Sequence, residues 1–291
     1  MKVVVSLPIH TSPEVVLNQI KNIQYFIPNV TVIIHVSKFF EWNGSPEKLH
    51  SLEMDNVLIN PERFPTKWGS GIHVDVHNSN FKYAVQNLEF DYFAMHSSND
   101  LFIKPGVKNY MCNYEAGSAQ WPLSLLIDWV KKDQYWGNKL KHKLQNSNLD
   151  LIKHLSEQDM NLSRIMKHLG ITEIKGSQIE GTFYRKEIFK EIVKEIERFY
   201  SYTNEDSFPY SKEEFYYSTV ASKFVKNFAP VYTFFNWRSP ITIELIDNAI
   251  ACNNQYNMGL DTYDLTNIFN VKRIERDLND PVRKYITDFI K

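Results

Sequence analysis

Short apolar runs alternate with longer amphipathic segments along the first third of the chain, and this order constrains the fold most. The apolar runs are rich in β-branched residues, which is typical of buried strands. The segments between them carry apolar residues at helical spacing. Strands and helices in alternation, joined by right-handed crossovers, predict an α/β fold with a mostly parallel central sheet and helices on both faces. The expected strands are 2–8, 30–36, 57–59 and 92–96, and the expected helices are 12–26 and 71–88.

Polar residues follow three of the expected strands. His10 and Thr11 follow the first strand, Ser37 and Lys38 follow the second, and residues 97–100 follow the fourth. Ligands of open parallel sheets bind at the carboxyl ends of the strands. We therefore expect these residues to form one rim of a binding site.

The rest of the chain is interpreted as part of the same single domain, 1–291. Residues 123–170 are rich in Lys, His, Asn and Gln and predict a helical insertion, because no Pro-, Gly- or Ser-rich linker sets them apart. Residues 176–185 are expected to return to the sheet as a strand. Another strand is expected at 231–237, and a mostly helical tail at 262–291.

Composition and charge exclude several functions. The formal net charge is -1, whereas a general nucleic-acid binder needs a basic stripe. Cys112 and Cys252 are too few for a disulfide framework and are expected to be buried free thiols in a reducing compartment. The apolar run at the N-terminus is too short for a signal peptide or a membrane span. We expect a cytoplasmic protein with at most peripheral contact to the inner face of a membrane, and its oligomeric state stays open.

Motifs of several enzyme classes are absent from the sequence. It contains no G-x-x-x-x-G-K-[ST] loop, no G-x-G-x-x-G after the first strand, no G-x-S-x-G elbow, no H-E-x-x-H and no C-x-x-C. His73 and His77 are four residues apart and could share a helix face. Without a third ligand nearby in sequence they are a weak metal signal, and no metal or cofactor is expected.

Two carboxylates lie in the first turn of a helix that is expected to begin at Ser211. Ser211 and Glu214 have S-x-x-E spacing, which is typical of a capping box. A carboxylate at a helix start can equally face a cleft and accept a proton from a reacting hydroxyl. The two interpretations are compatible, and both stay open at this point.

Several segments, in order along the chain, resemble motifs of glycosyltransferase family 14, the core-2 β-1,6-N-acetylglucosaminyltransferase and xylosyltransferase group. Each motif alone is weak, but the ordered set covers almost the whole chain. The segments are I-I-H-V-S-K at 33–38, D-Y-F-A-M-H-S-S-N-D-L-F-I-K at 91–104, K-G-S-Q to F-Y-R at 175–185, S-K-E-E-F-Y-Y-S-T at 211–219 and I-F-N-V-K at 268–272.

The resemblance implies a GT-A fold and an inverting, metal-independent transfer from a UDP-sugar, which is a substrate rather than a cofactor. It implies that Glu214 is the catalytic base and that Lys272 binds the diphosphate with a second basic residue, Arg238 or, failing that, Arg273. The insertion would lie on the acceptor side, and the acceptor would be a glycan or lipid-linked glycan. The remaining donor-side residues would be Pro8, His10, Val36, Trp68 and Asp100, and the acceptor-side residues Ser177, Glu180 and Glu213.

The sequence also departs from the family pattern. Ser37 stands where the family often has Asp, which affects contacts to the ribose, and Glu213 stands where it has Asp. Asp100 could instead bond only the backbone of its own turn, and Glu180 could be an ion-pair partner. The alternatives are a metal-dependent GT-A enzyme that uses Asn99 and Asp100, and an inactive glycan-binding scaffold. The donor would be N-acetylglucosamine-like or xylose-like, and the resemblance does not fix which.

Overall fold

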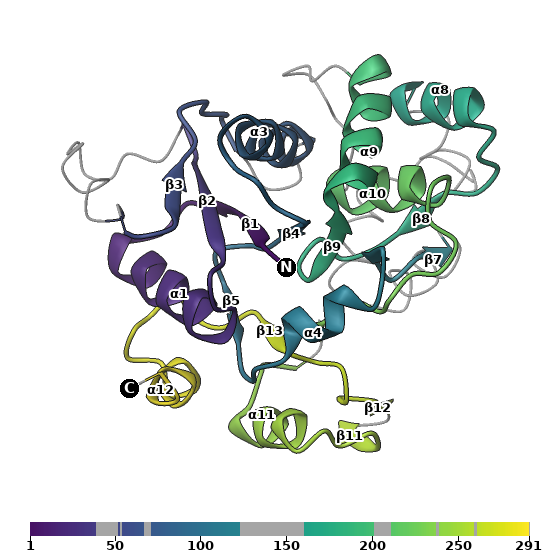
Figure 1. Cartoon of the computed structure of the whole chain (residues 1–291). Helices are drawn as coiled ribbons and strands as arrows, with labels where there is room; N and C mark the ends of the chain where they lie inside the picture. The colour runs from purple at the N-terminus through teal and green to yellow at the C-terminus, as the bar shows by residue number, and fades with distance from the viewer. Residues whose placement is uncertain are drawn as a thin grey trace, which may run out of the picture.

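The computed structural model describes residues 1–38, 52, 54–66, 71–122, 160–200, 211–236, 239–258 and 261–290. Trp68, Arg238 and most of the expected insertion lie outside these ranges. The expected α/β fold with a mainly parallel sheet is confirmed (Figure 1). The central sheet has the order β3-β2-β1-β4-β9-β6, in which the first four strands run parallel and the last two pair antiparallel. Its strands are β1 (Val3–Ile9), β2 (Thr31–Val36), β3 (Val57–Ile59), β4 (Tyr92–Met95), β6 (Ala116–Gly117) and β9 (Thr182–Arg185).

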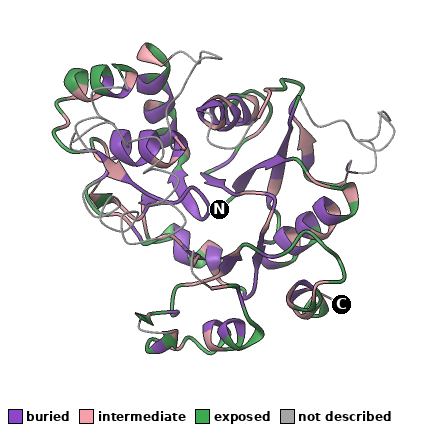
Figure 2. Ribbon diagram, turned by 180° about the vertical axis from the view of Figure 1, so that it is seen from behind, coloured by how far each residue is buried: buried purple, intermediate pink, exposed green. Residues whose placement is uncertain are grey.

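Alternate residues of β1 face two separate hydrophobic cores. Val3, Val5 and Leu7 pack on one face of the sheet, against helices α1 (Pro13–Phe26) and α4 (Val107–Cys112). Val4 packs on the other face, against helices α3 (Ile72–Asn87), α9 (Lys186–Phe199) and α10 (Glu213–Ala221). Successive side chains of a strand point to opposite faces, so only a continuous apolar run such as β1 can fill both cores. Figure 2 shows the resulting burial of the strands and of the inward sides of the helices.

The helices of the first third agree with the expected ranges. α1 begins directly after Ser12 with Pro13 at its first position, where a missing N–H costs nothing. Ser12, however, makes no side-chain capping hydrogen bond. The described helices are α1 (Pro13–Phe26), α3 (Ile72–Asn87), α4 (Val107–Cys112), α8 (Met160–Leu169), α9 (Lys186–Phe199), α10 (Glu213–Ala221), α11 (Ile243–Ile250) and α12 (Pro281–Asp288).

A second, smaller sheet lies beside the carboxyl end of the central one. In it β13 (Asn270–Lys272) pairs with β10 (Thr233–Phe234) on one side and with β5 (Asp100–Phe102) on the other. A third hydrophobic core joins this sheet to α11 and α12. Because β13 pairs with β5, the C-terminal part of the chain lies next to the turn that follows β4.

Two expectations about elements and one about the cysteines were wrong. The segment 176–185 is not one strand: β8 (Lys175–Gly176) pairs with β7 (Trp121–Pro122) in a separate ribbon, and only β9 enters the central sheet. The tail is not mostly helical, because β12 (Asp261–Tyr263), which pairs with β11 (Tyr256–Met258), and β13 precede α12. The free cysteines are exposed rather than buried. Within the described ranges, no helix is both long and apolar enough to cross a lipid bilayer.

Candidate active site

The order in which the chain adds strands to the central sheet reverses at β1. From β1 the chain moves outward to β2 and β3, and it then returns to the other side of β1 to form β4. In such sheets a ligand crevice forms where the carboxyl ends of the two diverging strands meet. His10 follows β1 at this point, and residues 97–100 follow β4. The rim expected from the sequence is therefore present at the switch point of the sheet.

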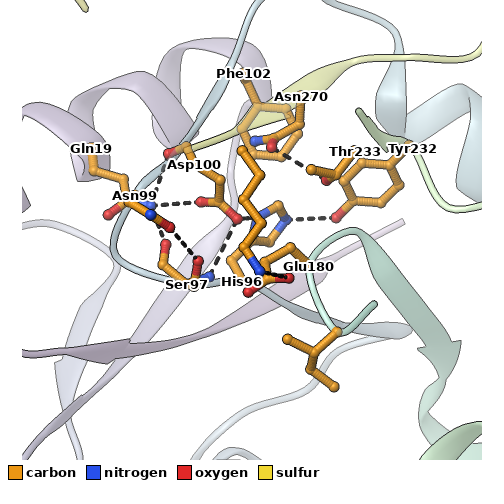
Figure 3. A network of polar contacts seen from close by, with 12 residues as sticks. Gln19, His96, Ser97, Asn99, Asp100, Phe102, Glu180, Tyr232, Thr233 and Asn270 are labelled. Carbon is orange, nitrogen blue, oxygen red and sulfur yellow. Dashed lines mark hydrogen bonds and ion pairs between the residues drawn. The ribbon is translucent and has the colours of Figure 1, made fainter. Parts of the chain in front are cut away.

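An ion pair between Lys272 and Glu180 lies at this rim. Lys272 Nζ is 2.6 Å from Glu180 Oε2, and the side chains are 15% and 4% exposed. Lys272 on β13 pairs with Asp100 on β5, so the small sheet positions the Lys272 side chain near the turn after β4. In Figure 3 the dashed line that ends on Glu180 marks this pair, close to Ser97. Burial alone would raise the pKa of Glu180, but the charge of Lys272 and hydrogen bonding to the carboxylate lower it.

Glycine at position 181 fixes the loop that carries Glu180. Gly181 has a φ of +80°, which residues with a Cβ rarely adopt, and its N–H donates to the carbonyl of Met95 at 3.1 Å. A Cβ at this position would lie 2.4 Å from Thr233 Oγ1. The loop thus turns tightly between β4 and β10, and Glu180 projects toward Lys272.

Glu213 is a second buried carboxyl group near the ion pair. It begins α10, is 7% exposed, and its Oε2 has no hydrogen-bond partner among the described residues. Burial and the nearby charge of Glu180 raise the pKa of Glu213 to about 8, against the opposing effects of backbone hydrogen bonding and Lys272. The carboxyl group is therefore mostly neutral at pH 7.

Glu214 follows on the helix and is only half-buried. Neighbouring residues of an α-helix point about 100° apart, so Glu214 and Glu213 project in different directions. The carbonyl of Glu214 accepts the Ser177 N–H at 2.9 Å, which fastens the start of α10 to the segment after β8. The N-cap residue of α10 is Lys212, whose side chain makes no capping hydrogen bond, and the Glu214 N–H donates to the carbonyl of Ser211 at 3.1 Å.

Ser177 and Asp100 are both committed to contacts within the protein. The Ser177 hydroxyl accepts the Ala119 N–H and donates to the carbonyl of Gln178, each at 3.0 Å. Asp100 is 1% exposed and accepts from Gln19 at 2.7 Å, from His96 Nδ1 at 2.8 Å and from the Ser97 N–H at 3.2 Å. The other His96 nitrogen lies 2.7 Å from the hydroxyl of Tyr232. Figure 3 marks this contact with a dashed line. These hydrogen bonds to Asp100 stabilise the turn that follows β4.

The other expected donor-side residues lie at the carboxyl ends of β1 and β2. Pro8 pairs with His35, and Val36 pairs with Ile9; the side chains of Pro8 and Val36 are buried in the sheet. His10 is exposed directly beyond β1. Of these residues, only His10 offers a polar side chain at the rim.

Two residues that the sequence analysis did not assign to the site also lie at the rim. His73, near the start of α3, has its pKa lowered to about 4 by burial, and Glu180 and Lys272 are close enough to act on it. Arg276 donates to the Ser98 hydroxyl at 3.2 Å. In the sequence, only the position of Arg276, four residues after Lys272, could have indicated that Arg276 lies at the rim.

The histidine pair considered for metal binding does not share a site. His77 is buried in the core, with its Nδ1 2.8 Å from Ser6 Oγ, whereas His73 lies at the rim. Across the described ranges, no group of three or more His, Cys, Asp or Glu side chains is arranged to hold a metal ion.

No protein-family model matches the chain, and no curated protein matches its sequence. Among solved structures, the galactosyltransferase LgtC in complex with donor and acceptor sugar analogues has a TM-score of 0.45 and 10% identity, over 100% of this chain and 95% of that chain. An active-site mutant of LgtC has a TM-score of 0.43 and 11% identity, over 99% and 94%. Core-mannan synthase A from Aspergillus fumigatus, in its Mn/GDP form, has a TM-score of 0.35 and 10% identity, over 77% and 68%. Similarity at this level does not assign the chain to a family.

Proposed function

We propose that the protein is a GT-A glycosyltransferase that moves a sugar from UDP to a hydroxyl group of a glycan. The observation that carries the proposal is Lys272, a partly buried lysine at the carboxyl edge of a mainly parallel sheet, beside the switch point. Nucleotide ligands of open α/β sheets bind at this edge. An amino group there can neutralise the charge that develops on a departing diphosphate.

The mechanism that we propose is a single inverting displacement. The acceptor hydroxyl oxygen attacks C1 of the donor sugar, the bond from C1 to the diphosphate breaks, and the leaving UDP carries the electron pair toward Lys272. Glu214 takes the hydroxyl proton as general base. A base must be ionised before it can act, and the high pKa of Glu213 makes that residue the poorer candidate at pH 7.

The contacts of the turn after β4 support transfer without a metal ion. Both Asp100 oxygens already accept hydrogen bonds inside the protein, and Asn99 Oδ1 accepts one from the Ser97 hydroxyl at 2.9 Å. A hard divalent cation needs several oxygen ligands that are free to turn toward it. A metal-dependent GT-A enzyme that uses Asn99 and Asp100 is the alternative, and loss of activity in chelator with recovery in Mn²⁺ would identify it.

The finer assignment rests on the sequence resemblance. We propose a family 14-like enzyme that transfers N-acetylglucosamine, xylose or a similar sugar. Its acceptor would be a growing surface polysaccharide or a lipid-linked glycan, at the cytoplasmic face of the membrane. Arg238 remains our proposal for the second basic residue at the diphosphate, and Trp68 for a wall of the donor pocket.

Donor turnover tests this proposal. The purified chain is incubated in EDTA with a panel of UDP-sugars and glycan acceptors, and release of UDP is followed together with the transferred sugar. We expect one donor to be turned over in EDTA and the product to have inverted anomeric configuration. Glycan binding without binding or turnover of any nucleotide sugar would favour the inactive scaffold instead.

A further inference from the structure

Lys272 pairs with a buried carboxylate at the rim of the sheet. Its Nζ lies 2.6 Å from Glu180 Oε2, so the two opposite charges attract each other at short range. Lys272 Nζ also lies 5.2 Å from the centre of the Phe235 ring, which supports the long side chain along one side. A diphosphate at the rim offers the amino group more negative charge than one carboxylate does.

The ionic state of Glu180 depends on Lys272. Arg273 packs on the same Phe235 ring as Lys272. The ionisable groups whose pKa values respond to the pair are Glu213 from α10 and His73 from α3. Neither carries much charge at pH 7, because the pKa of Glu213 is raised to about 8 and that of His73 is lowered to about 4 by burial. Lys272 is thus the cation that keeps the 4% exposed Glu180 ionised.

We propose that Glu180 is an internal counter-ion of Lys272 that the donor diphosphate replaces, and that Glu180 then takes up a proton from solvent. This inference rests on the proposed function. A buried carboxylate that loses its cation is more stable in the neutral form, and a neighbouring carboxyl group strengthens that preference. Once protonated, Glu180 can donate a hydrogen bond to a sugar hydroxyl, which it cannot do while paired with Lys272.

The exchange gives the site an order of events. Before the donor binds, Glu180 is ionised and paired with Lys272, so its carboxylate can only accept hydrogen bonds. After the donor has bound, the same side chain becomes a hydrogen-bond donor beside Glu213. Donor binding therefore creates a hydrogen-bond donor for the acceptor sugar, and we expect the donor to bind before the acceptor.

Proton-linked calorimetry tests the exchange. UDP is titrated in EDTA at pH 7.5 in two buffers, Tris and PIPES, which differ in their enthalpy of ionisation. We expect wild-type protein to take up about one proton per UDP bound. Glu180→Gln should take up none and should bind UDP about fivefold tighter or more, because it removes the competing anion. Glu213→Gln is the matched control and should keep the uptake, since Gln resembles the neutral form of Glu213.

Each outcome has a separate meaning. UDP binding with the same proton balance in wild type and Glu180→Gln would overturn the exchange but leave the proposed function intact. Failure of wild-type protein to bind UDP or any UDP-sugar would overturn both. If Glu180→Gln does not fold, as judged by its thermal unfolding, Glu180→Asp replaces it. This variant withdraws the carboxylate from Lys272, so UDP should bind more tightly and take up fewer protons than with wild-type protein; unchanged affinity and unchanged proton uptake would contradict the exchange.

Discussion

Lys272 Nζ lies 2.6 Å from Glu180 Oε2, although one residue comes from the C-terminal small sheet and the other from the loop before β9. The contact joins two parts of the fold at the carboxyl edge of the central sheet. It places Lys272, whose charge lowers the pKa of Glu180, at the edge where we propose that the phosphates of a nucleotide bind. The proposed chemistry depends on this position.

Removal of the Lys272 charge should weaken nucleotide binding. Charged hydrogen bonds contribute enough that Lys272→Ala is expected to lower UDP affinity by about tenfold to a hundredfold. Lys226→Ala is the matched control, because Lys226 is exposed on the loop after α10. Calorimetry on both variants measures the difference. Equal UDP affinity in Lys272→Ala and Lys226→Ala would contradict the assignment of Lys272 to the diphosphate.

Loss of the proposed base should lower turnover without affecting donor binding. Glu214→Gln is expected to reduce kcat by about 10²- to 10⁴-fold, since general-base catalysis contributes that much. UDP affinity should stay within about twofold, because the base acts on the acceptor hydroxyl rather than on the diphosphate. The comparison variant is Glu213→Gln, which keeps a neutral group at a neighbouring position and should lose less activity. Wild-type turnover in Glu214→Gln would refute the role of Glu214.

The raised pKa of Glu213 should make the fold less stable at high pH. The unfolded chain loses this proton near pH 4.5, whereas the folded protein keeps it until about pH 8. Within this window the folded state binds more protons than the unfolded state, so stability falls as pH rises, by at most about 1.4 kcal/mol per pH unit. Glu213→Gln removes this dependence.

Urea unfolding of both proteins from pH 5 to pH 8 measures the effect. Other groups titrate partly in the same range. The histidines with lowered pKa values, which are His10, His35, His73 and His77, act with the opposite sign, and Asp75, whose pKa is raised to about 6, acts with the same sign. They are common to both proteins, so the difference in free energy of unfolding isolates Glu213. We expect the variant to gain stability relative to wild type as pH rises, and a difference that does not change with pH would contradict the buried state of Glu213.

Asp100 should matter for stability more than for nucleotide affinity. Asp100→Asn replaces an oxygen that accepts from His96 and Ser97 with a group that can donate, so buried partners lose an acceptor. Each lost partner costs about 1–3 kcal/mol. We expect a clear fall in the melting temperature and a UDP affinity close to wild type when the protein is measured below its melting point. A stable variant with strongly weakened UDP binding would instead place Asp100 at the donor.

The first half of the fold could be predicted from local sequence. β1 and β2 are continuous apolar runs, and the start of α1 is marked by Ser12 and Pro13, so pattern and turn chemistry agree there. The sequence did not predict the pairing of β13 with β5 or the helix α11. Those elements are short, and they are stabilised mainly by packing against distant parts of the chain.

The site could be predicted in its location but not in its contacts. Polar residues after β1, β2 and β4 indicated the rim, because parallel topology brings these ends together. Local patterns contain no signal that joins Glu180 to Lys272, since this contact forms only when β13 of the small sheet packs beside the loop before β9. For Asp100, the sequence suggested hydrogen bonds within its own turn. It did not predict that the side chain would also accept hydrogen bonds from His96 and Gln19.

The most direct test of the central claim is UDP binding to wild-type protein by calorimetry, first in EDTA and then with Mn²⁺. A basic clamp at Lys272 needs no cation, so we expect UDP to bind in EDTA with an affinity that Mn²⁺ changes little. Binding that requires Mn²⁺ would contradict metal-independent transfer and favour the alternative use of Asn99 and Asp100. Absence of binding in both buffers would contradict UDP-dependent transfer altogether.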